Sequence, residues 1–179
     1  MGARTDRDGP GGRSCGLFQE TGGELARGPY SARLTELGIV IPDVAAPVAS
    51  YVPARTTGNL LYTAGQLPFV DGSLPATGKL GAGVSLADGV EYARICTLNA
   101  LAVAQSELGS LDRVAQIVKV NGFVASSPDF FQQPTVLNGA SELLGEVFGD
   151  IGKHARAAVG VAVLPLDAPV ELELIIEFS

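Results

Sequence analysis

Three charged side chains lie near the beginnings of two runs whose neighbouring residues are typical of β-strands. Residues 154–178 read HARAAVGVAVLPLDAPVELELIIEF, which places Arg156, Glu171 and Glu173 among alanines, valines and leucines. A guanidinium can hold a carboxylate by two parallel hydrogen bonds, so Arg156 is a candidate for binding an anionic ligand. The alternative is that Arg156 and the glutamates form solvated surface pairs, each worth about 0–1 kcal/mol. The residues alone leave both interpretations open.

The alternation of side chains along a strand indicates which residues share a face. In 155–164 valines alternate with Arg156 and small residues, and in 170–178 leucines alternate with glutamates. We expect the valine and leucine faces to pack on helices and the opposite face to meet another chain. If LPLDAP turns the two strands into a hairpin, Arg156 lies too far along its strand to face Glu171. A site containing both residues would then need a second subunit or a bulge.

The other reactive side chains are few. The chain has one histidine, His154, and two cysteines, Cys15 and Cys96, without a C-x-x-C motif or a Cys/His cluster. A structural zinc site is therefore not expected. His154 could take part in catalysis, but we interpret it as a loop residue near the exit of a helix. Cys96 is interpreted as a small core residue of its helix.

The spacing of apolar residues predicts the elements that must position these side chains. Ser85 with Asp88 resembles a capping box, and Gly109 is a candidate C-terminal cap for the helix between them. The full set of expected elements is strands 50–56 and 60–67, helix 85–108, strand 113–126, helix 134–149, and strands 155–164 and 170–178. This β-β-α-β-α-β-β order favours an α+β fold, a mixed sheet with two helices on one face. The uncovered face predicts oligomerisation.

Length and composition limit the class of protein. The chain has 179 residues, of which 17% are charged, and its formal net charge is −7. We expect residues 1–33 to be a disordered or loosely attached extension and residues 34–179 to form one domain. The acidic balance argues against a nucleic-acid partner. The absence of an 18-residue apolar run, and of a signal-peptide core, predicts no membrane partner and a cytoplasmic protein.

Several motifs together resemble a known family. LYTAGQLP, VKVNGFVASSPDF and HARAAVGVAVLP followed by VELE are similar, in order and spacing, to the Rid family, also called the YjgF or L-PSP endoribonuclease family. The resemblance covers about residues 36–178. It implies a chorismate-mutase-like α+β fold and a homotrimer whose ligand clefts lie between neighbouring subunits. Such clefts would supply the second subunit that the hairpin register requires.

The resemblance also implies site residues. Arg156 matches the arginine that binds the substrate carboxylate, and Glu171 of VELE matches the water-orienting glutamate. Tyr51, Gly65 and Asn138 match the remaining substrate-binding positions, although Tyr51 could be an ordinary edge-strand aromatic and Asn138 a local helix partner. The sequence departs from the family at three positions, where His154, Ala158 and Ala64 replace a proline, a frequent cysteine and a serine.

The family's best-known activity is hydrolysis of 2-imino acids to 2-keto acids and ammonia. The resemblance therefore predicts an imine or enamine deaminase-like hydrolase that acts on a small carboxylate substrate, with no metal or organic cofactor. The alternative is a non-catalytic trimer that binds a small carboxylate metabolite in the same cleft. Ribonuclease activity is least favoured, because the chain is acidic and has no pair of histidines.

Overall fold

A five-stranded mixed sheet forms the centre of the protein. The computed structural model describes residues 28–44 and 51–179. The strands lie in the order β1-β2-β7-β5-β6, and every neighbouring pair is antiparallel except β5 with β6. Their bounds are β1 Ala54–Thr57, β2 Leu60–Thr63, β5 Val114–Ala125, β6 Ala155–Val161 and β7 Val170–Phe178. Two short strands, β3 Lys79–Leu80 and β4 Gly83–Val84, pair separately.

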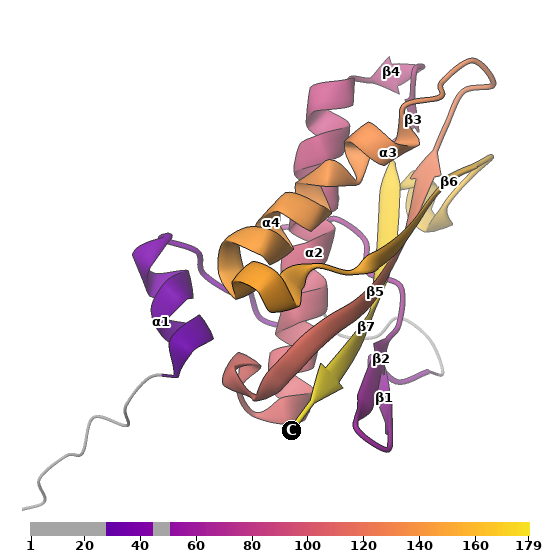
Figure 1. Cartoon of the computed structure of the whole chain (residues 1–179). Helices are drawn as coiled ribbons and strands as arrows, with labels where there is room; N and C mark the ends of the chain where they lie inside the picture. Colours follow the sequence, from indigo (N-terminus) through magenta and orange to yellow (C-terminus); the bar gives the residue numbers. More distant parts are fainter. Residues whose placement is uncertain (1–27, 45–50) are drawn as a thin grey trace, which may run out of the picture.

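The helices cover one face of this sheet, as the sequence predicts (Figure 1). The long helix α2, Leu86–Leu108, begins where Ser85 Oγ accepts from the Asp88 N–H and ends at Gly109, whose φ of 79° terminates the helix. The second expected helix is divided into α3, Gln133–Val136, and α4, Asn138–Phe148. Three 3₁₀ turns follow the ends of longer elements: η1 Leu111–Arg113, η2 Gly149–Gly152 and η3 Pro165–Asp167.

The hydrophobic core lies between the helices and this face of the sheet. Leu172, Leu174 and Ile176 of β7 are fully or almost fully buried, which confirms the expected leucine face. Cys96 is also fully buried on α2, and burial raises the pKa of its thiol well above the ordinary value. Cys96 is therefore a core residue, as expected.

The last two strands do not form the expected hairpin. β5 lies between them, parallel to β6 and antiparallel to β7, and residues 162–169 cross from one side of β5 to the other. The sequence-based prediction failed because consecutive strands usually pair, whereas β5 offers a longer partner to both. The predicted register between Arg156 and Glu171 therefore does not apply.

The expected packing of the valine face is wrong as well. In the parallel register Val120 pairs with Arg156 and Gly122 with Ala158, so Arg156 and Ala158 belong to the rows of side chains on the helix side. Val159 lies on the opposite side and is 46% exposed. At this edge the helix side is filled by small residues and Arg156 rather than by valines.

The start of the described chain is an ordered helix. α1, Pro29–Glu36, is held by Asp112, whose Oδ1 accepts from the backbone N–H of Tyr30 at 2.8 Å and of Ser31 at 3.0 Å. The Tyr30 ring packs on Phe148 with a centroid distance of 4.9 Å. The expected boundary between residues 33 and 34 therefore falls inside a packed helix. Residues 1–27 lie outside the described residues.

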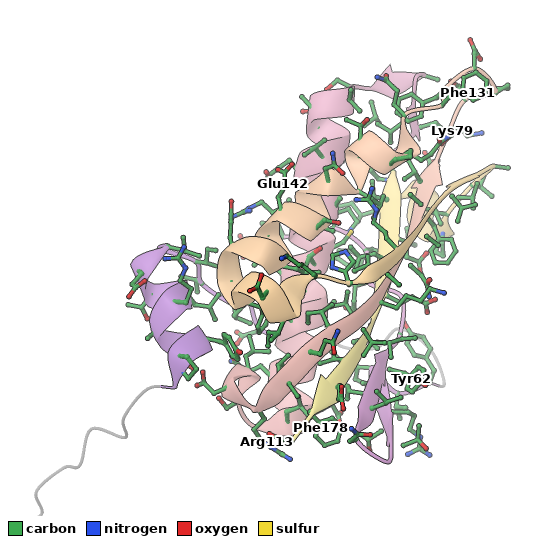
Figure 2. The ribbon with its side chains drawn as sticks, viewed as in Figure 1. Tyr62, Lys79, Arg113, Phe131, Glu142 and Phe178 are labelled. Atoms are coloured by element: carbon green, nitrogen blue, oxygen red, sulfur yellow. The ribbon has the colours of Figure 1, made fainter. Side chains whose placement is uncertain are left out.

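The face of the sheet away from the helices carries exposed apolar side chains. Tyr62, labelled in Figure 2, is 40% exposed and pairs with Ile175 across β2 and β7. Val159 lies on the same face of β6. Nothing in the described part of the chain covers this surface. Within those residues, no helix is both long and apolar enough to cross a membrane.

Candidate functional site

Arg156 is held by two helices although it belongs to an edge strand. Its Nη1 donates to Asn138 Oδ1 at 3.0 Å and to Ser141 Oγ at 2.9 Å, and its Nη2 donates to Pro134 O at 3.2 Å. Of the five guanidinium N–H groups, Nε–H and one on Nη2 have no hydrogen-bond partner among the described residues. Those two donors remain able to bind an anion.

Asn138 and Ser141 reach the same guanidinium because they are three residues apart on α4 and therefore share a face. Close contact between helices fixes that face, since a Cβ on Gly139 would lie 2.0 Å from Val90 O of α2. Only glycine allows α4 to approach α2 this closely. The i, i+3 spacing from Asn138 was the sequence signal that could have identified Ser141.

His154 supports Ser141 from the connection between η2 and β6, where a loop residue was expected. Its Nε2 is 3.0 Å from Ser141 Oγ, and its Nδ1 is 2.7 Å from Gly152 O. These residues line a surface cavity of about 310 Å³ together with Gly145, Lys153 and Arg156. The cavity therefore has a basic rim.

Glu171 and Gly65 form a second group of predicted site residues. A Cβ on Gly65 would lie 1.8 Å from Glu171 Oε1, so the carboxylate rests directly against the glycine backbone. Glu171 is partly buried, and desolvation together with the charge of Glu173 raises the pKa of its carboxyl. Glu173 itself accepts a hydrogen bond from Asn121 Nδ2 at 3.1 Å. A carboxylate with a raised pKa is suited to accept a proton.

The two groups lie on opposite faces of the sheet. Phe123 of β5 pairs with Glu171 on one side and Val159 on the other, so Glu171 and Val159 occupy the same row on the open face. Arg156 lies three residues before Val159 and faces the helices. Arg156 forms no ion pair with either glutamate in the described part of the chain. A single protomer therefore does not unite the residues that the sequence assigns to one site.

The other predicted position, Tyr51, lies just before β1 and is 49% exposed. It has no hydrogen bond to another described residue. Ala158 follows Arg156 on the same side of β6 and is partly buried, whereas Ala64 precedes Gly65. Because both residues are alanines, neither supplies the hydroxyl or thiol that a serine or cysteine would place there.

The described residues offer no candidate metal centre. Within residues 28–44 and 51–179, no set of three or more His, Cys, Asp or Glu side chains could hold an ion. A larger cavity of about 640 Å³ lies between residues 40–44, the turn at 69–72 and α2. None of the predicted site residues lines it.

Comparisons with known proteins match this chain to a family. Residues 31–178 match the family described as "YjgF/chorismate_mutase-like, putative endoribonuclease". Protein TCP17 of Trypanosoma cruzi is 46% identical over 156 residues, which are 87% of this chain and 98% of TCP17.

Two solved structures have the same fold. Atu1372 of Agrobacterium tumefaciens, a protein described as having unknown function, superposes with a TM-score of 0.78 at 44% identity, covering 84% of this chain and 92% of its own. The YjgF gene product of E. coli gives a TM-score of 0.57 at 30% identity, covering 75% and 93%. The matches confirm the predicted α+β, chorismate-mutase-like fold, and the chain belongs to the YjgF family.

Proposed function

We propose that this protein hydrolyses small 2-imino acids to 2-keto acids and ammonia in a site completed between two subunits of a homotrimer. The arrangement of Arg156 is the observation that carries the proposal. Three protein acceptors fix its guanidinium, and two N–H donors stay free for the two oxygens of a carboxylate. Asn138 acts in this site by holding the arginine.

Glu171 is proposed as the proton acceptor. Its raised pKa, caused by desolvation and Glu173, favours removal of a proton from a water molecule as the water oxygen attacks the imine carbon. The imine nitrogen takes up a proton from solvent, which gives a carbinolamine. Glu171 then returns the proton it gained to this nitrogen, the C–N bond breaks with loss of ammonia, and the hydroxyl proton passes to solvent as the keto group forms, so the carboxylate is regenerated.

Gly65 and Tyr51 are proposed to complete the substrate end of the site. A side chain at position 65 would collide with Glu171, so the glycine lets the carboxylate lie against the peptide backbone, where the substrate is proposed to bind. Tyr51 is exposed and lies just before β1, where it can reach a neighbouring subunit. Its hydroxyl would then contact the substrate.

Two features of one protomer support the proposed trimer. Arg156 and Glu171 face opposite sides of the sheet, so a site containing both requires the Glu171 face of one subunit beside the Arg156 edge of another. The exposed apolar side chains of the open face, including Tyr62 and Val159, favour burial against a second chain. A rotational trimer repeats this contact three times and closes.

The deciding experiment measures 2-oxobutanoate and ammonia release while an amino-acid oxidase generates 2-iminobutanoate from 2-aminobutanoate. The parent should accelerate release above the spontaneous rate, and Arg156→Ala should not. Arg94→Lys is the matched control, because Arg94 pairs with Glu146 on the helix surface away from the predicted residues. Equal rates with and without the parent protein would reject the deaminase activity.

Binding without turnover is the second candidate, favoured by the alanines at 64 and 158. Neither alanine side chain can hydrogen-bond a water molecule or substrate. Isothermal titration with 2-oxobutanoate distinguishes the two functions: a binder without activity shows Arg156-dependent heat but no imine hydrolysis.

A further inference from the structure

The polar chain Gly152–His154–Ser141–Arg156 has one consistent set of hydrogen-bond donors and acceptors when the imidazole is neutral. Gly152 O can only accept, so His154 Nδ1, 2.7 Å away, carries the proton. His154 Nε2 is then an acceptor, and the Ser141 hydroxyl at 3.0 Å must donate to it. With its proton so directed, Ser141 Oγ presents a lone pair to Arg156 Nη1 at 2.9 Å.

This order matters because Arg156 needs to be restrained. The residue is exposed and belongs to an edge strand, and a free arginine side chain has many rotamers to lose when it binds a ligand. Asn138 and Ser141 accept from the same Nη1 nitrogen, while Pro134 O accepts from Nη2. Together they fix the plane of the guanidinium, which leaves the Nε–H group pointing in one direction.

We propose that Ser141 and His154 are positioning residues that orient Arg156 for its carboxylate ligand, with the Gly152 carbonyl setting the imidazole tautomer. The proposal rests on the proposed carboxylate-binding function of Arg156. Neither residue contacts the reacting atoms: His154 acts on Ser141, and Ser141 acts on the arginine. Orientation before binding strengthens affinity, because the ligand no longer has to order the side chain.

The histidine offers a direct readout, because His154 is the only histidine of the chain. Nitrogen NMR of the untagged, ¹⁵N-labelled protein near pH 8 should show one neutral imidazole with Nδ1 protonated and Nε2 unprotonated. Addition of 2-oxobutanoate should shift the Nε2 signal in the parent through Ser141. In Ser141→Ala the same addition should leave the Nε2 signal almost unmoved. A neutral imidazole protonated on Nε2 would overturn the proposed order of donors.

Affinity for 2-oxobutanoate provides the second test. Loss of one hydrogen bond to the arginine should weaken binding about three- to tenfold in Ser141→Ala. His154→Phe keeps a ring but no hydrogen bond, so it should weaken binding by a smaller factor. His154→Gln places an amide oxygen near the position of Nε2 and should recover most of the affinity. Ser106→Ala, at an exposed serine of α2, is the matched control and should bind as the parent does.

Thermal unfolding of each variant distinguishes a loss of positioning from a loss of folding. The expected losses of affinity apply to variants whose melting temperature equals that of the parent. If Ser141→Ala and His154→Phe bind as tightly as the parent, the positioning role is wrong while carboxylate binding by Arg156 stands. If the parent binds no 2-oxobutanoate, the proposed function fails and the positioning role falls with it. The imidazole tautomer is measured in either case, so the two failures are distinguishable.

Discussion

Arg156 and Glu171 face opposite sides of one sheet, on strands that flank β5. Two residues placed in this way can share a ligand only if they come from different protomers. Whether the site forms between subunits can therefore be tested with two inactive variants, one without Arg156 and one without Glu171. Each variant would keep the residue that the other lacks.

Mixed oligomers of Arg156→Ala and Glu171→Gln should therefore regain activity. In a cyclic assembly formed at random from equal amounts, about one site in four joins an intact Arg156 to an intact Glu171. Imine hydrolysis should rise from background to about a quarter of the parental rate after the variants are unfolded and refolded together. Separately refolded variants, combined afterwards without exchange, are the control. If co-refolded mixtures stay inactive, the two residues do not meet between subunits.

Glu171→Gln should stabilise the fold at neutral pH while it lowers turnover. The pKa of Glu171 is raised above 4.5 by desolvation and by Glu173, so the folded state favours the protonated form. That favourable contribution is complete below pH 4.5 and is lost as the pH rises through the raised pKa. The melting temperature of the glutamine variant should thus exceed that of the parent at pH 7, and the difference should disappear near pH 4. Glu91→Gln, at an exposed glutamate of α2, is the matched control for the loss of a carboxylate.

Gly65→Ala should lower turnover through displacement of Glu171. The new methyl group would meet the end of a flexible side chain, 1.8 Å from Oε1, so the carboxylate can move away without disruption of the fold. We expect a large loss in kcat with a melting temperature close to that of the parent. In the Glu171→Gln background the same change should have much less effect on kcat. Independent, additive losses would contradict a role that acts through Glu171.

Asp112→Ala should release α1 from the domain. The carboxylate accepts hydrogen bonds from the backbone of Tyr30 and Ser31 and from the Ser31 hydroxyl, so its loss should cost about 1–3 kcal/mol. Amide hydrogen exchange should accelerate in Pro29–Glu36 and little elsewhere. Unchanged exchange in this helix would show that its apolar contacts alone hold it.

The contact between Asp112 and α1 should be sensitive to acid. Desolvation raises the pKa of Asp112, but the hydrogen bonds from Ser31, Tyr30 and Ser110 outweigh it and lower the pKa below 3.8. The stabilisation is therefore present above pH 3.8 and is lost as the pH falls through the lowered value. The difference in melting temperature between parent and Asp112→Ala should shrink correspondingly in acid.

Local signals explain which parts of this fold could be predicted. The cap residues Ser85 and Gly109 fixed the bounds of α2, and alternation identified the buried side of β7. The position of β5 between β6 and β7 could not be read from alternation, because the pattern of one strand does not name its partners. The packing of α1 on the domain could not be predicted for a related reason: the residue that holds it, Asp112, lies 82 positions from Tyr30.

The candidate site also divides into residues with a local sequence signal and contacts that depend on the packing of distant elements. The resemblance identified Arg156 and Asn138, which the structure places in contact, and Gly65 and Glu171, which it also places in contact. Ser141 was missed although it lies three residues after Asn138, and its contact with His154 was missed because that contact depends on how α4 crosses toward β6. That crossing is set by the packing of Gly139 on α2, which no pattern within the segment itself encodes.

Because β6 is an edge strand, the charge of Arg156 should also affect the solubility of the protein. Residues 155–161 read ARAAVGV, so Arg156 is the only charge on a strand whose outer edge pairs with no other described strand. Free edges rich in alanine and valine can pair with the edges of other molecules, and a charged side chain opposes such pairing. The guanidinium proposed to hold a ligand would also keep folding intermediates from associating edge to edge. Neutral substitutions at 156 should therefore lower the yield of dispersed protein, whereas Arg156→Lys should preserve it.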